Sequence, residues 1–112
     1  MIEIASWVRN EGMKGPFLVE IDHGLDYFQI LTQQPVWVDH KQGAAVMWEP
    51  SFYEQWMSRY REVSKLKVSA EFLAYAKLHN IKYIVMRVKY GECSQGSIAR
   101  FRNEGYLFCE VL

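Results

Sequence analysis

The sequence predicts a small α/β domain with three layers, in which helices cover both faces of one central sheet. Segments with strand character alternate with segments of helical periodicity along the chain. Residues 83–86 form an apolar run without alternation, which is typical of a strand covered on both faces. A chain of 112 residues suffices for one hydrophobic core, so we expect a single domain over residues 1–112.

The first part of the chain predicts a helix, a strand and a second helix. Apolar side chains recur at helical spacing in residues 2–11, and Gly12 is placed to end that helix. After Pro16, residues 17–21 are mostly apolar and predict a strand. Residues 25–33 allow either the second arm of a hairpin or a short helix. The helix is favoured because their apolar side chains recur three apart.

The middle of the chain predicts a strand at residues 35–38, which Pro35 can open, and a short strand at residues 45–48. Ser51 and Glu54 form a capping-box pattern, which predicts the start of a helix. One stripe of that helix is expected to face the core, and it comprises Tyr53, Trp56, Met57, Tyr60 and Ser64.

A second helix is expected from Ser69, with Asn80 in a left-handed conformation at its end and Ile81 packed behind it. Residues 82–88 predict a buried strand, and residues 106–112 predict the last strand. Residues 98–105 between them are interpreted as a turn of helix or irregular chain.

This order predicts a mainly parallel, Rossmann-like sheet of about four strands, with right-handed crossovers. The last connection is short, which allows an antiparallel final strand at an edge of the sheet.

Composition excludes several classes of protein. Thirteen basic residues balance thirteen acidic ones, which disfavours a nucleic-acid partner. No apolar run approaches the ~20 residues that span a bilayer, and the N-terminus lacks a signal-peptide core. Cys93 and Cys109 match no zinc pattern and are interpreted as a loop thiol and a buried thiol. A disulfide between them would need an oxidising compartment.

Two Asp-His pairs follow the first two predicted strands. Asp22 and His23 follow the strand at residues 17–21, and Asp39, His40 and Lys41 follow the strand at residues 35–38. In open α/β sheets ligands bind outside the carboxyl ends of parallel strands, so these residues are expected along one rim. Asp is also common at strand ends for structural reasons, and that interpretation stays open.

An aromatic side chain at the same rim would add a stacking surface for a sugar ring. The complete set of candidate ligand-binding residues is Asp22, His23, Tyr27, Asp39, His40, Lys41 and Trp48. The chain carries neither a glycine-rich phosphate loop nor a nucleophile-elbow pattern. We therefore assign no catalytic residue, no resident metal and no cofactor.

Taken in order, several segments resemble the soluble C-terminal domain of bacterial polytopic membrane glycosyltransferase-like proteins of the mannosyltransferase (GT-C) kind. The likeness covers most of the chain, in "EIASWVRNEG", "PFLVEIDHGLDYFQILTQQPVWVDHK", "PSFYEQWMSRY", "YAKLHNIKYIVMRV" and "RFRNEGYLFCEVL". Gln34 departs from the pattern, because an arginine often precedes the Pro-Val strand in that family. The family's catalytic acids lie in loops of its membrane part, so the resemblance implies none here.

The resemblance implies an extracytoplasmic, non-catalytic domain at the bacterial membrane. Its partners would be a glycan or a lipid-linked sugar, together with the membrane-embedded region of the same protein. Two alternatives remain open, and for both a cytoplasmic location is expected. One is a stand-alone protein-interaction module of the phage or mobile-element type. The other is an acyltransferase-like enzyme, although residues 59–71 lack the glycine that its pyrophosphate-binding loop would need.

Overall fold

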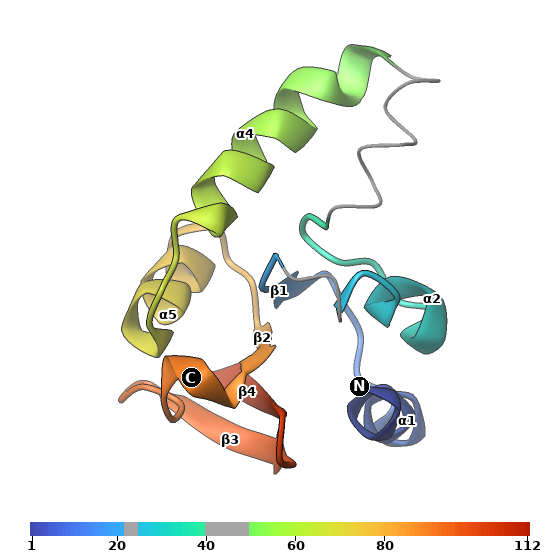
Figure 1. The fold of residues 1–112 in the computed structure, drawn as a ribbon, viewed down its shortest axis with the longest axis vertical. Coiled ribbons are helices and arrows are strands. Elements are labelled where there is room, and N and C mark those ends of the chain that lie inside the picture. Colours follow the sequence, from blue (N-terminus) through green and yellow to red (C-terminus); the bar gives the residue numbers. More distant parts are fainter. Residues whose placement is uncertain (22–24, 40–49) are drawn as a thin grey trace.

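A computed structural model of the protein describes residues 1–21, 25–39 and 50–112 (Figure 1). Within these ranges no helix combines the length and the apolar character that crossing a membrane would require. The elements in chain order are α1 (Ile2–Glu11), β1 (Phe17–Val19), α2 (Phe28–Thr32), η2 (Pro50–Phe52), α4 (Tyr53–Ser64), α5 (Ser69–Leu78), β2 (Tyr83–Arg87), η3 (Val88–Tyr90), β3 (Ser97–Arg102) and β4 (Tyr106–Val111).

The described strands form one mixed sheet in the order β1-β2-β4-β3. Strand β1 is parallel to β2, whereas β4 is antiparallel to both β2 and β3. The prediction of a mainly parallel, Rossmann-like sheet is therefore wrong. The final strand, β4, is antiparallel to its neighbours, as its short connection allowed. It lies inside the sheet, however, and β3 is the edge strand.

A hairpin at the end of the chain explains this departure from a parallel sheet. The segment interpreted as irregular chain contains β3, and only residues 103–105 separate β3 from β4. The Asn103 side chain accepts hydrogen bonds from the amides of Gly105 at 3.0 Å and Tyr106 at 2.8 Å. This local turn directs β4 back along β3, so the two strands must be antiparallel.

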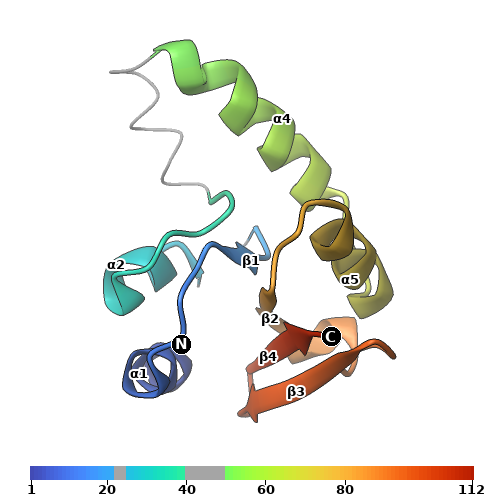
Figure 2. The same ribbon diagram turned by 180° about the vertical axis from the view of Figure 1, so that it is seen from behind.

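Helices cover both faces of the sheet, with α4 and α5 on one side and α1 and α2 on the other (Figures 1 and 2). The two faces follow from side-chain alternation along the strands. Leu18 and Ile84 contribute to the cluster that includes Phe72 and Ala76 of α5. Their neighbours in the strands, among them Phe17 and Val85, pack with α1 and α2 instead.

The chain after α2 runs alongside β1. Val36 forms an isolated parallel bridge with Phe17, and the Trp37 amide donates to the Phe17 carbonyl at 2.7 Å. The direction predicted for residues 35–38 is thus observed, although the pairing is one bridge and no strand is assigned there.

One prediction about α4 is wrong. The 3₁₀ turn η2 leads directly into α4, so Ser51 lies within the helical turns and its side chain does not cap the helix. The predicted core stripe is confirmed in part, because Trp56 and Tyr60 pack against the core whereas Tyr53 is exposed. Val63, which lies outside the predicted stripe, is the buried residue of α4.

Helix α5 ends as predicted, with Asn80 at φ 58° and Ile81 buried.

The interpretation of the cysteines as two separate thiols is also wrong. Cys93, in the loop after η3, forms a disulfide with Cys109 of β4. The hairpin and the preceding loop bring their Cα atoms within 5.8 Å, a separation that suits a disulfide. Cys109 is buried against the α5 side of the sheet, so the disulfide fastens the loop to that core.

Candidate functional site

Three chain segments have their carboxyl ends on the same side of the sheet. Strands β1 and β2 are parallel, and the segment after α2 is parallel to β1 at its bridge. Glu20 follows β1, Asp39 lies three residues beyond Val36, and Arg87 ends β2. The carboxyl ends of parallel strands are where ligands bind in open α/β sheets. We call Glu20, Arg87 and Tyr90 the strand-end site.

Glu20 is a buried carboxylate, with 2 % of its surface exposed. Its Oε1 accepts hydrogen bonds from the Arg87 amide at 2.5 Å and from Arg87 Nε at 2.9 Å. Its Oε2 is buried and has no hydrogen-bond partner within the described part of the chain. A buried acceptor without a donor costs free energy, so this oxygen marks a position where a further donor would be stabilising.

Tyr90 lies beside this ion pair. Its hydroxyl is 3.4 Å from Arg87 Nη2, a long contact for a hydrogen bond. Burial raises the pKa of Tyr90, and the nearby Glu20 carboxylate raises it further. The neutral hydroxyl is therefore the stable form beside the Glu20 carboxylate.

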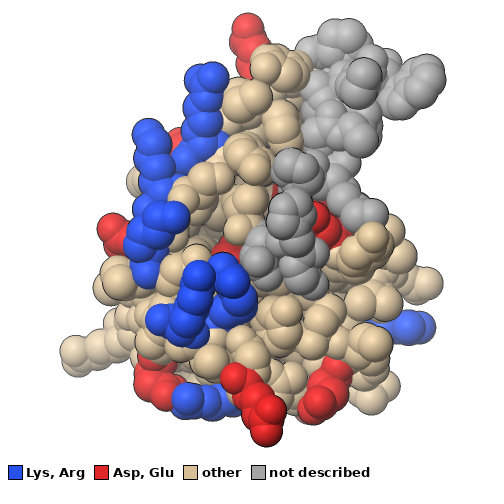
Figure 3. All heavy atoms as spheres, in the orientation of Figure 1, with Lys and Arg blue, Asp and Glu red and all other residues tan. Residues whose placement is uncertain are grey.

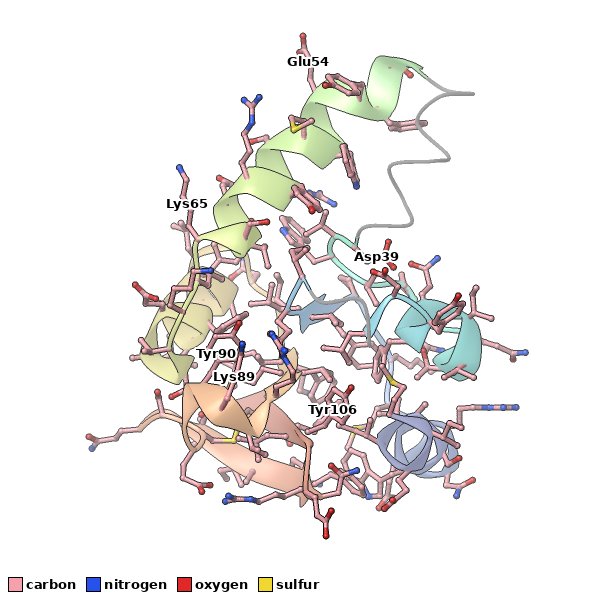
Figure 4. All side chains as sticks on the ribbon, in the orientation of Figure 1. Asp39, Glu54, Lys65, Lys89, Tyr90 and Tyr106 are labelled. Carbon is pink, nitrogen blue, oxygen red and sulfur yellow. A yellow bond between two sulfur atoms is a disulfide. The ribbon has the colours of Figure 1, made fainter. Side chains whose placement is uncertain are left out.

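Asp39 and Tyr27 are the two predicted ligand-binding residues that the structure describes. Asp39 is buried, and its backbone carbonyl accepts a hydrogen bond from Trp56 Nε1 of α4 at 3.0 Å. Tyr27 immediately precedes α2 and is exposed. In the view of Figure 4, Asp39 lies on the α2 side of β1 and Tyr90 on the α5 side. The other predicted residues, Asp22, His23, His40, Lys41 and Trp48, lie outside the described residues.

A second cluster fixes α4 above the strand ends. The Arg59 guanidinium lies 3.5 Å from the centre of the Trp37 ring and donates to the Trp37 carbonyl at 3.2 Å. Trp37 Nε1 donates to the Tyr75 hydroxyl at 2.9 Å, and that hydroxyl donates to Glu62 at 3.0 Å. Burial is the main cause that raises the pKa of Tyr75 to about 12. The Arg59 guanidinium covers one face of the Trp37 ring, so that face is not open for stacking on a sugar.

The face around the strand-end site carries many cationic side chains. Figure 3 shows Lys and Arg gathered along α4 and below it. Figure 4 labels two of the lysines on this face, Lys65 beyond the end of α4 and Lys89 directly before Tyr90. Across residues 1–21, 25–39 and 50–112, no group of three or more His, Cys, Asp or Glu side chains is placed to hold a metal ion.

Sequence reasoning missed all three residues of the strand-end site. The available signal was a single charged residue at the end of each apolar run, Glu20 after β1 and Arg87 at the end of β2. Gln34, the position that departs from the family pattern, has a structural role, because its Oε1 accepts a hydrogen bond from the Gly15 amide at 3.0 Å.

Comparison of the chain with protein-family models, with curated proteins and with solved structures finds no match.

Proposed function

We propose that the chain is a non-catalytic, extracytoplasmic domain of a bacterial membrane sugar transferase and binds a glycan or a lipid-linked sugar at its strand ends. The observation that carries the proposal is the buried Glu20 carboxylate beside Arg87, at the carboxyl end of the parallel strand pair. A carboxylate accepts from sugar hydroxyls and a guanidinium donates to them, so the pair suits a polyhydroxylated ligand.

Two further observations support this proposal. The Cys93–Cys109 disulfide suits an oxidising compartment, such as the outer side of the bacterial membrane. The cationic side chains on the same face of the molecule, of which Lys89 directly precedes Tyr90, suit the phosphate that links a sugar to its lipid. The assignment to a sugar transferase rests on the sequence resemblance.

Chemical-shift mapping tests the proposed binding surface. The ¹⁵N-labelled chain is titrated with methyl α-mannopyranoside, a neutral sugar probe, with ethylene glycol as a control for weak nonspecific effects. We expect the largest shifts at the strand-end site, at Asp39 and at the other predicted ligand-binding residues. Shifts confined to β3, at the opposite edge of the sheet, would contradict the proposed surface.

A further inference from the structure

Helix α4 carries a shallow groove along one of its sides. Every described residue that lines this groove belongs to α4 itself. The lining residues are Tyr53, Glu54, Met57, Ser58, Arg61 and Glu62. Five of them are exposed and Met57 is partly buried, so this surface, which we call the α4 groove, is accessible to a partner.

The two charged side chains at the centre of the α4 groove have no partner within their own helix. Glu54 and Arg61 are seven residues apart, which places them on the same face of α4 and about 10 Å apart along the helix axis. Charged side chains on one helix pair when they are three or four residues apart, and Met57 and Ser58 occupy those positions here. Among the described residues, neither Glu54 nor Arg61 forms an ion pair.

We propose that the α4 groove is a dimerisation surface, on which α4 of a second copy packs antiparallel about a two-fold axis. The axis passes beside the midpoint between Met57 and Ser58, which is the centre of the lining residues. Two-fold symmetry then places Glu54 opposite Arg61 of the second copy, and the same pair repeats at the other end of the contact. This inference goes beyond the proposed sugar binding and does not depend on it.

The order of charges along α4 selects the antiparallel orientation. A parallel pair in the same register would place Glu54 against Glu54 and Arg61 against Arg61, and like charges repel. The antiparallel pair brings opposite charges together, and Lys65 directly after α4 adds a second cation at the end that meets Glu54 of the second copy. Figure 4 shows Glu54 and Lys65 near opposite ends of the helix, with both side chains directed away from the sheet.

The middle of the α4 groove lets two helices approach each other. Ser58 is small, and Met57 is a flexible apolar side chain that fills irregular gaps, with the exposed Tyr53 ring one turn before it. Glu62, at the margin of the groove, accepts a hydrogen bond from the Tyr75 hydroxyl and so holds α4 to its own chain. A contact along one helix of 12 residues is small beside the ~1,200 Å² of a stable interface, so the dimer is weak and depends on concentration.

Sedimentation equilibrium of the full chain between ~10 µM and ~1 mM measures the Kd of the dimer. Glu54→Arg and Arg61→Glu each turn two attractive contacts into repulsive ones because of the symmetry, so each should raise Kd by roughly tenfold or more. The double variant Glu54→Arg, Arg61→Glu exchanges the charges, restores both pairs and keeps the net charge, so its Kd should return to within about threefold of wild type. Glu104→Arg, in the turn between β3 and β4, is the matched control and should leave Kd unchanged.

Salt supplies a test that needs no variant, because raising NaCl from about 50 mM to about 500 mM screens exposed ion pairs and should raise the wild-type Kd. A wild-type chain that stays monomeric at ~1 mM would overturn the inference. So would a dimer whose Kd responds neither to salt nor to Glu54→Arg, since another surface would then join the copies. A folded double variant that dimerises as weakly as the single variants would contradict the antiparallel pairing. All of these results leave the proposed sugar binding standing, because the glycoside titration tests it separately.

Discussion

Reduction of the disulfide should destabilise the chain by an amount that follows from loop length. Cys93 and Cys109 are 16 residues apart, and closing a loop of this length removes entropy from the unfolded chain. The loop-closure relation gives about 3 kcal/mol at 25 °C. For a chain of this size, that free energy corresponds to a fall in Tm of about 12 °C.

Thermal unfolding followed by circular dichroism measures this effect in the oxidised protein with and without a thiol reductant. The double variant Cys93→Ala, Cys109→Ala is the control, because its Tm should be low and should not respond to reductant. Mass spectrometry confirms the thiol state of each sample. If the oxidised and reduced proteins melt within about 2 °C of each other, the disulfide does not constrain the unfolded chain as argued.

Three further changes test other parts of the structure. Gly15→Ala would place its Cβ 2.2 Å from the Pro35 carbonyl oxygen. This substitution should lower the free energy of unfolding, measured in urea, by about 1–3 kcal/mol. An unchanged urea midpoint would contradict the close approach. Glu20→Gln should lower the free energy of unfolding by about 1–3 kcal/mol in the same assay, because its carboxylate is buried. Glu110→Gln, at a half-exposed ion pair, should lower it by less than about 1 kcal/mol. Equal losses of stability would argue against a buried carboxylate at position 20. Stability should fall as the pH rises from 10 to 12, because Tyr75 has its pKa raised to about 12 in the folded chain and therefore deprotonates first in the unfolded chain. A Tyr75→Phe variant whose stability falls as steeply over this range would contradict that assignment.

The local elements were more predictable than the sheet. The helix at α1 and its left-handed stop at Gly12 follow from spacing and from the backbone freedom of glycine, both of which are local properties. Strand β3 was not predictable in this way. It is an edge strand whose residues 98–100 are all exposed, so its sequence lacks the alternation of a half-buried strand.

The α4 helix shows how much of a buried face an apolar stripe predicts. Trp56 and Tyr60 of the predicted stripe pack against the core, and Val63 beside it is buried. Two polar contacts of α4 were not predictable in this way: Arg59 stacks on Trp37, and Glu62 accepts from the Tyr75 hydroxyl. Periodicity reports where apolar residues lie on a helix, and it does not report which polar side chains find partners across a tertiary contact.

The directions of the chain segments that end at the candidate site were predictable from the sequence, whereas the pairing of its residues was not. Parallel directions for β1, β2 and residues 35–38 could be inferred from the sequence, and the pairings agree with them. The partnership of Glu20 with Arg87 joins residues 67 apart in sequence, and only the register of β1 on β2 brings them together. Such a pairing leaves no local pattern for sequence reasoning to detect.

Intermolecular nuclear Overhauser effects between a bound glycoside and the ¹³C-labelled chain test the central claim most directly. If sugar hydroxyls bind at the carboxyl ends of the parallel strands, ring protons of methyl α-mannopyranoside should show contacts to Arg87 and to the Tyr90 ring. Contacts confined to the side chains of β3, with none at β1 or β2, would contradict the account.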